Sequence, residues 1–197
     1  MDVAVEGRSA HAGQEPEKGV SAIRIAAEII AKLSLGRIDR ETTANVGVIQ
    51  GGSVRNAVPE SASFMGEIRS RDEKKLIKIT RQWEHAIASV QGKYPKAKIA
   101  LKIERQFDGY LFTKDHPLVG LVTRAFKSVG MKPTFIHSGG GTDVNVFNTK
   151  GIVAIGVGAA SWDAHTTREY TKISELVKVA KFAEAIMRDA RRVDREG

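Results

Sequence analysis

The first 107 residues switch repeatedly between the two-residue period of strands and the three-to-four-residue period of helices, and this order constrains the fold more than any other feature. Apolar and polar residues alternate over 60–69 and 99–103, which predicts strands with one solvent-exposed face. Apolar residues recur at steps of three and four over 20–33 and 76–90, which predicts two amphipathic helices. Shorter strands are expected over 2–6 and 44–50.

The expected order is therefore strand, helix, strand, strand, helix, strand. This is the order of a ferredoxin-like βαββαβ unit, in which two helices back an antiparallel sheet. We expect the first helix to bury one apolar stripe, made of Val20, Ile23, Ala26, Ala27, Ile30 and Leu33. The first part of the chain is thus predicted to be an α+β domain.

The spacing of apolar residues changes after residue 107. Apolar spacing predicts helices over 117–129 and 173–190 and a short strand over 134–136. The continuous apolar run 152–157, bounded by glycines, is typical of a parallel strand buried on both faces. We expect the last helix to cover such a sheet with the face formed by Ile173, Leu176, Val177, Ala180, Ala183 and Met187.

We place the domain boundary at residue 110, inside the connector 107–115. An α+β domain is then expected over 1–110 and an α/β segment over 111–197. Two or three strands and two long helices are too few for a parallel sheet with both faces covered. The α/β segment is therefore expected to be incomplete, either because a partner supplies strands or because the chain is part of a longer protein.

The chain contains no cysteine, which excludes disulfides, a thiolate zinc site and a cysteine nucleophile. Any metal would have to be held by histidine, aspartate or glutamate. The first residues show neither an apolar signal segment nor a cleavage motif, and no stretch is apolar enough to span a membrane. We therefore expect a cytoplasmic protein with no membrane partner.

The net charge is +8, from 31 basic and 23 acidic residues, and a basic surface can serve nucleic acid or anionic substrates. The basic residues are interleaved with acidic ones, as in 69–75, and aromatic residues, at 6%, are too few for a base-stacking platform. We therefore expect no nucleic-acid partner, and nucleic-acid binding is the least favoured function.

Taken one at a time, the residues that could carry chemistry are weak signals. His165 follows the predicted buried strand, where α/β sheets present site residues, although most loop histidines are simply solvated. The SGGGTD segment at 138–143 opens a predicted helix and suits either an anion site or a tight turn. Arg69 shares a strand face with Glu67, which by itself indicates a surface ion pair.

The ordered set of motifs is more specific than any member. The segments GRSAHAGQEPEKGVSAI, LGRIDRETTANVGVIQGGSVRNAVPE, GEIRSRD, SGGGTDVNVFN and HTTREYTKISEL resemble the peptidase T-like branch of the co-catalytic zinc metallopeptidases, which is related to aminoacylase and succinyl-diaminopimelate desuccinylase. The resemblance extends from about residue 3 to about residue 190. It implies that residues 1–107 correspond to a lid or dimerisation domain and the remainder to the C-terminal part of a catalytic domain.

The resemblance also implies roles for individual residues. His165, in HTTRE, matches a zinc-ligand histidine, and His11, in SAHAG, matches a lid histidine that stabilises the oxyanion of the tetrahedral intermediate. Asn56 and Arg69 match lid positions that hold a substrate carboxylate. The loop glycines that admit the substrate backbone are matched by Gly140 and Gly141.

In the family, the HxD ligand pair, the bridging aspartate, the general-base glutamate and the next carboxylate ligand lie before the lid, and this sequence has no HxD and no Glu-Glu pair. A catalytic zinc ion needs about three protein ligands, so the two zinc ions of the intact enzyme are not expected to be fully bound by this chain. The expected function is that of a fragment of a zinc-dependent peptidase hydrolysing small peptides, tripeptidase- or aminopeptidase-like, and inactive alone. A homodimer through the lid is expected, and the alternative is a non-catalytic dimerisation or binding module.

Overall fold

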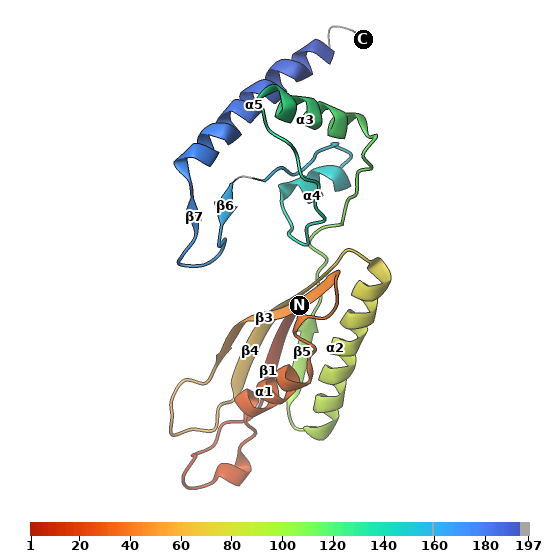
Figure 1. Cartoon of the computed structure of the whole chain (residues 1–197). Coiled ribbons are helices and arrows are strands. Elements are labelled where there is room, and N and C mark those ends of the chain that lie inside the picture. Colours follow the sequence, from red (N-terminus) through yellow and green to blue (C-terminus); the bar gives the residue numbers. More distant parts are fainter. Residues whose placement is uncertain (159, 194–197) are drawn as a thin grey trace. The chain divides into compact units, whose positions relative to one another are not determined.

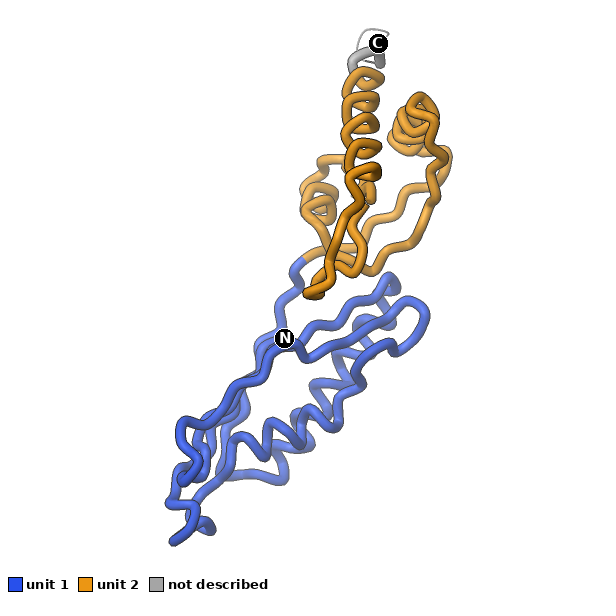
Figure 2. Tube along the Cα trace, turned by 60° about the vertical axis from the view of Figure 1, so that its left-hand side comes forward, with its two compact units in different colours: residues 1–106 blue, residues 107–197 orange. Residues whose placement is uncertain are grey.

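The computed structural model describes residues 1–158 and 160–193. The chain divides into two compact units, unit 1 (Met1–Gln106) and unit 2 (Phe107–Gly197), which Figure 2 shows in blue and orange. Residues 159 and 194–197 of unit 2 lie outside the described residues. Each unit has a buried apolar cluster of its own.

Unit 1 is an antiparallel sheet with two long helices (Figure 1). The sheet order is β2-β3-β4-β1-β5, and every neighbouring pair of strands is antiparallel. The α+β fold predicted for the first part of the chain is therefore confirmed, with β2 as an additional short edge strand. The elements are β1 (Asp2–Glu6), a 3₁₀ turn (Pro16–Lys18), α1 (Ala22–Lys32), β2 (Gly36–Arg37), β3 (Thr42–Gly51), β4 (Ser61–Ser70), α2 (Glu73–Lys93) and β5 (Lys98–Lys102).

The helices of unit 1 begin at capping residues that the sequence supplies. Ser21 Oγ accepts a hydrogen bond from the Arg24 N–H at the start of α1, and the Asp72 carboxylate accepts the N–H groups of Lys74 and Lys75 at the start of α2. Each cap satisfies backbone donors that have no partner within the helix. Both helix starts are thus determined locally.

The buried stripe of α1 differs from the predicted one. The side chains that face the sheet are Ala22, Ile25, Ala26, Ile29 and Leu33, whereas Ile23 is 41% exposed and Ala27 is exposed. The segment AIRIAAEII is apolar around much of the helix circumference, so its periodicity is compatible with two stripes. Packing against the sheet selects one of them.

The two faces of β4 have different environments. Phe64 points toward the helices and is buried, and Gly66 lies against the Trp83 ring, since a Cβ at Gly66 would come within 2.8 Å of that ring. Side chains alternate along a strand, so Met65 and Arg69 lie on the opposite face. A register shift in β3 between Val46 and Val48 adds Val48 to that face, opposite Met65.

Unit 2 contains α3 (Pro117–Ser128), α4 (Asp143–Thr149), the strand pair β6 (Ser161–Trp162) and β7 (Tyr170–Thr171), and α5 (Ile173–Val193). Its core forms where α3 packs against α5. The rings of Phe126 and Phe182 lie 4.2 Å apart between centroids, and Val122 and Ala125 are buried beside them. The predicted helices 117–129 and 173–190 therefore form.

The strands predicted over 134–136 and 152–157 were wrong. Among the described residues of unit 2, only β6 and β7 pair in a ladder, and Ile152 and Val153 are 57% and 60% exposed. A strand requires a neighbouring backbone to take its hydrogen bonds, and an apolar run alone does not provide one.

The face of α5 that was expected to cover a sheet is likewise exposed. Ile173, Leu176 and Met187 lie largely in solvent, whereas Phe182 faces α3. The reason is that the only sheet in the described part of unit 2 is the short β6–β7 pair, which is too small to cover this face. The helix is apolar on two sides, and only one of them has a partner.

Candidate functional site

His11 lies in the loop between β1 and the 3₁₀ turn, and its side chain is exposed. The imidazole Nδ1 accepts a hydrogen bond of 3.2 Å from the Gly13 N–H. In the neutral ring this leaves Nε2 as the N–H donor. The loop thus selects the tautomer that can donate a hydrogen bond through Nε2 to an oxyanion.

The backbone brings His11 and Asn56 into neighbouring loops. His11 and Ala57 form an isolated antiparallel β-bridge. On either side of it, the Ala12 N–H donates to the Asn56 carbonyl at 3.0 Å and the Val58 N–H donates to the Ala10 carbonyl at 2.9 Å. Asn56 is exposed like His11. Two predicted site residues from distant sequence positions are therefore presented together at one end of unit 1.

Arg69 lies at the other end of β4. Asn56 comes five residues before the first residue of this strand, and Arg69 is next to its last residue, Ser70. At about 3.3 Å per residue, Arg69 lies roughly 26 Å from Ser61 along the strand. Within one chain, then, Arg69 and Asn56 do not share one carboxylate.

Arg69 forms the surface ion pair that its strand position indicated. Its Nη2 lies 2.8 Å from Glu67 Oε2, and the two side chains are 37% and 53% exposed. Exposed pairs of this kind contribute at most about 1 kcal/mol. The guanidinium is therefore accessible to a competing carboxylate at little energetic cost.

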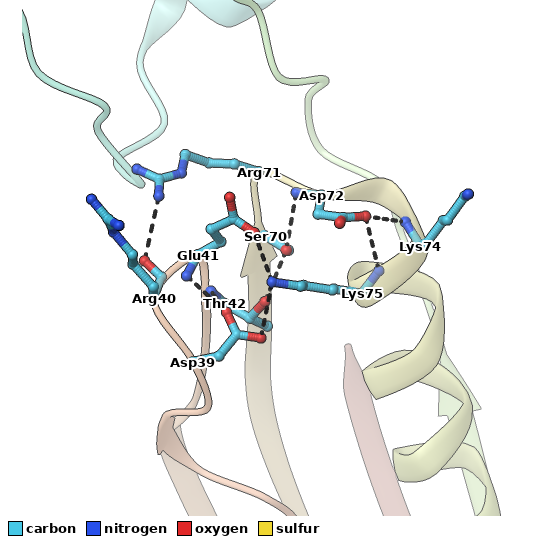
Figure 3. A network of polar contacts seen from close by, with 9 residues as sticks. All are labelled: Asp39, Arg40, Glu41, Thr42, Ser70, Arg71, Asp72, Lys74 and Lys75. Atoms are coloured by element: carbon cyan, nitrogen blue, oxygen red, sulfur yellow. Dashed lines mark hydrogen bonds and ion pairs between the residues drawn. The ribbon is translucent and has the colours of Figure 1, made fainter.

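A polar network fixes the backbone beside Arg69 (Figure 3). Thr42 lies on β3 and is fully buried. Its hydroxyl forms a hydrogen bond of 2.9 Å with the Ser70 hydroxyl. Ser70 Oγ also accepts the Asp72 N–H at 3.2 Å. These bonds connect β3 with the junction between β4 and α2.

The charged part of this network surrounds the Lys75 ammonium. Lys75 Nζ lies 2.7 Å from Glu41 Oε2 and 3.5 Å from Asp39 Oδ2. The hydrogen bond to Glu41 raises the pKa of Lys75. The pKa of Asp39 is lowered, first by the hydrogen bond from the Glu41 N–H and further by the charge of Lys75. These groups hold the β2–β3 turn against the start of α2.

The glycine-rich loop of unit 2 is held by local packing. The Gly140 N–H donates to Ser138 Oγ at 3.0 Å. A Cβ at Gly141 would come within 2.1 Å of the Phe107 ring, so any larger residue at this position requires the Phe107 side chain to move. That requirement is independent of any substrate.

Asn145 ties α4 to the connector. Its side chain is buried; Oδ1 accepts the Thr142 N–H at 3.0 Å, and Nδ2 donates to the Asp108 carbonyl at 2.8 Å. Asn145 thus caps the start of α4. His116 likewise caps a helix, since its Nδ1 accepts the Leu118 N–H at 3.2 Å.

His165 lies exposed in the turn between β6 and β7, in the left-handed backbone region with φ of 66°. Its N–H donates to Glu169 Oε2 at 3.2 Å, and the Ser161 hydroxyl donates to Glu169 Oε1 at 2.8 Å. The Ser161 hydroxyl, and next the His165 N–H, lower the pKa of Glu169. A pocket of about 360 Å³ adjoins the strand pair, lined by Ser161, Glu169, Tyr170, Thr171 and Leu176.

The described residues do not form a complete zinc site. They contain no group of three histidine, aspartate or glutamate side chains able to hold one ion, and both oxygens of Glu169 already accept hydrogen bonds. A zinc site that included His165 would need further ligands from outside the described residues. Among the helices of the described residues, none combines the length and apolar character needed to cross a bilayer.

Comparison with known proteins connects this geometry to a family. Residues 1–95 match the family described as peptidase dimerisation domain. The aminopeptidase PepT from Bacillus cereus superposes on 95% of this chain with a TM-score of 0.73 and 35% identity. The chain is therefore similar to peptidase T-like proteins, and its residues 1–95 belong to the peptidase dimerisation-domain family. A tripeptidase from Staphylococcus aureus matches 94% of this chain with a TM-score of 0.78 and 30% identity.

The chain also resembles the uncharacterised protein YqjE of Bacillus subtilis, with 36% identity over 191 residues that make up 95% of this chain. It spans about half the length of the relatives that it matches, namely 50% of YqjE and of PepT and 49% of the tripeptidase. The similarity thus covers unit 1 and most of unit 2.

Sequence reasoning did not identify Glu169 as part of the site. Glu169 follows His165 by four residues within HTTRE, and this spacing was visible in the sequence. Its meaning depends on the pairing of β6 with β7, which brings Ser161 back to Glu169. Two strands of two residues each leave no periodic signal in a sequence.

Proposed function

We propose that this chain supplies the dimerisation domain and the C-terminal part of the catalytic domain of a zinc-dependent peptidase that cleaves small peptides. The observation that supports this most directly is its similarity, over 94–95% of its length, to an aminopeptidase and a tripeptidase. The absence of cysteine is compatible with a reducing cytoplasm, where we place the activity.

In this proposal, each exposed candidate residue has one role. His165 provides a metal ligand, and His11 donates a hydrogen bond from Nε2 to the oxyanion that develops on the scissile carbonyl. Asn56 and Arg69 bind carboxylate groups of the peptide, and Gly140 and Gly141 line the path of its backbone. Zinc would supply the activated water in the assembled enzyme.

Two observations on unit 1 support a homodimer. Residues 1–95 match a dimerisation domain, and Arg69 lies roughly 26 Å along β4 from Ser61, the strand end that Asn56 precedes by five residues. A carboxylate site that uses both residues therefore requires Asn56 from one chain and Arg69 from a second. Dimerisation would bring the lid residues of one protomer to the substrate of the other.

The test is complementation. The chain alone should hydrolyse no di- or tripeptide, and the upstream half of the Bacillus cereus PepT, added in trans, should restore cleavage of trialanine together with bound zinc. His165→Ala should abolish the restored activity and lower the zinc content, whereas His11→Ala should lower kcat by about 10²–10³-fold with zinc retained.

The matched control is His85→Ala, which removes an exposed histidine on α2 without affecting the proposed site. It should leave both zinc and turnover unchanged. Stoichiometric zinc and peptidase turnover in the chain alone would contradict the proposal. Full activity of the complemented His165→Ala variant would contradict the ligand assignment.

The second candidate function is a dimerisation module without catalysis, and the match of residues 1–95 favours it independently. It predicts that residues 1–106 sediment as a dimer at micromolar concentration, with no requirement for metal. A dimer combined with failed complementation would favour this function, and a monomer at high concentration would exclude it.

A further inference from the structure

The turn between β6 and β7 holds two residues in the left-handed backbone region, and a third lies just before β6. Ala160, Asp163 and His165 have φ values of 56°, 53° and 66°, and none of them is glycine. Residues that have a Cβ rarely adopt this backbone conformation, and it persists only where surrounding interactions stabilise it. The turn therefore requires specific contacts to keep its shape.

Each of the three residues has such a contact from a side chain. The Thr171 hydroxyl donates to the Ala160 carbonyl and the Thr166 hydroxyl to the Asp163 carbonyl, both at 2.7 Å. The His165 N–H donates to the Glu169 carboxylate at 3.2 Å. Among these three contacts, the one from Glu169 acts on the candidate ligand itself.

The Glu169 carboxylate is in turn anchored to the strand pair. Its other oxygen accepts the Ser161 hydroxyl at 2.8 Å, and Ser161 pairs with Thr171 across the two strands. Glu169 also immediately precedes β7. One carboxylate thus connects the paired strands to the residue that presents the imidazole.

The strand pair has supports that do not involve Glu169. Trp162 and Tyr170 stack with centroids 5.5 Å apart and planes 17° from parallel, and Lys172 Nζ lies 5.7 Å from the Trp162 ring. These contacts lie on the strand face opposite Ser161, because side chains alternate along a strand. The loss of Glu169 should therefore loosen the turn while leaving β6 and β7 paired.

We infer that Glu169 is a positioning residue, whose carboxylate holds His165 in the left-handed conformation and so fixes where the imidazole is presented. This inference deepens the proposed function and rests on it for the role of the imidazole as a metal ligand. Partners that orient a ligand commonly change metal affinity by 10–100-fold when they are removed.

The first experiment measures the backbone in the full chain by nuclear magnetic resonance. Glu169→Ala removes both carboxylate contacts and should increase the hydrogen-exchange rate of the His165 amide by about tenfold, with a change in its φ-dependent coupling constant. Glu169→Gln should remain within about twofold, because its amide oxygen can accept the His165 N–H while its amide nitrogen donates to the Ser161 hydroxyl. The Trp162 and Tyr170 amides should not change in either variant.

A matched control removes a neighbouring contact of the same turn. Thr166→Ala removes the bond to the Asp163 carbonyl and the bond from the Arg168 N–H, and it leaves the two bonds of Glu169, so His165 should exchange at the rate of the unsubstituted chain. An unchanged His165 amide in Glu169→Ala would overturn the inference. An equal increase of the His165 exchange rate in Thr166→Ala would also overturn the inference, because the whole turn, and not Glu169 in particular, would then hold His165.

The second experiment uses the chain complemented with the upstream half of PepT and zinc as the probe. Glu169→Ala should weaken zinc binding in a chelator competition by about 10–100-fold, and Glu169→Gln should restore it. Undiminished zinc affinity in Glu169→Ala would overturn the inference. Failure of the unsubstituted complex to bind zinc would instead refute the proposed function, and the exchange rates would still decide the role of Glu169.

Discussion

At the scale of the residue, the neighbours that a side chain meets decide its role more than its type does. His11 and His116 both accept a backbone N–H through Nδ1, yet His116 caps a helix while His11 stands in an exposed loop beside Asn56. The cap formed by His116 is local, because it involves only the first residues of α3. The position of His11 beside Asn56 depends on loop pairing across some forty-five residues, and local sequence patterns contain no information about it.

The two apolar stripes of α1 give a test at this scale. Ile29 is fully buried, whereas Ile23 is 41% exposed. Ile29→Ala should lower the free energy of unfolding by about 2–5 kcal/mol, because it leaves a cavity beneath the helix, and Ile23→Ala should lower it by less than about 1 kcal/mol. Urea unfolding followed by circular dichroism measures both. Equal losses would mean that the helix is rotated from the position described here.

A second test at this scale concerns Glu28 on α1. Hydrogen bonds from Lys93 and from the Tyr94 hydroxyl lower the pKa of Glu28 below its usual value of 4.5. A carboxyl whose folded-state pKa is lowered stabilises the fold above its unfolded pKa, and that contribution is lost as the pH falls through the folded pKa. Glu28→Gln should therefore be less stable than the unsubstituted chain at pH 7, with the difference vanishing toward pH 3.

The control for this pH dependence is Glu84→Gln, at an exposed position on α2. Its effect on the urea midpoint should be the same at both pH values. A stability difference for Glu28→Gln that is as large at pH 3 as at pH 7 would contradict the ionic origin of the effect.

At the scale of the element, close packing of α2 on β4 determines which residues fit. The Trp83 ring occupies the space beside Gly66, where a Cβ would come within 2.8 Å of the ring and 2.9 Å of the Asn45 carbonyl. The period of α2 predicted that Trp83 is buried. No pattern predicted that its ring requires glycine on the strand below.

Two glycine substitutions should consequently have opposite effects. Gly66→Ala should destabilise unit 1 by about 1–3 kcal/mol, because the added methyl group overpacks the contact with Trp83. Gly92→Ala, inside α2 with open space around the added atom, should stabilise it by about 0.5–1 kcal/mol. Thermal unfolding of both variants measures the signs, and stabilisation by Gly66→Ala would contradict the packing described here.

At the scale of the whole molecule, the two units differ in how much of their apolar surface is covered. Unit 1 buries fifteen apolar residues in one cluster, whereas the buried cluster of unit 2 comprises Val122, Ala125 and Phe182. Large apolar side chains of unit 2 are exposed, among them Leu111, Ile136, Ile152, Val153 and Ile173. Exposed apolar surface of this extent is typical of surfaces that another polypeptide covers.

This difference in covered apolar surface predicts that the two units differ in independent folding and in dye binding. Residues 1–106 should fold alone with the urea midpoint that unit 1 shows in the full chain, because their core is complete. The full chain should bind an apolar dye such as anilinonaphthalene sulfonate, and the isolated residues 1–106 should not. Addition of the upstream half of PepT should suppress the dye signal. Equal dye binding by both chains would contradict this distribution of exposed surface.

The sequence by itself determined the elements whose patterns are local. The strand alternation at 60–69, the helix periods at 20–33 and 76–90, and their order along the chain were enough for an α+β fold in unit 1, because periodicity and caps act over a few residues. Only the tertiary structure decided the stripe of α1, the Gly66–Trp83 contact and the link from Ser161 through Glu169 to His165. It also left the apolar run 152–157 unpaired among the described residues. These features depend on which surfaces meet after the chain folds, and a strand, a buried face or a shared carboxylate exists only where a second segment arrives to complete it.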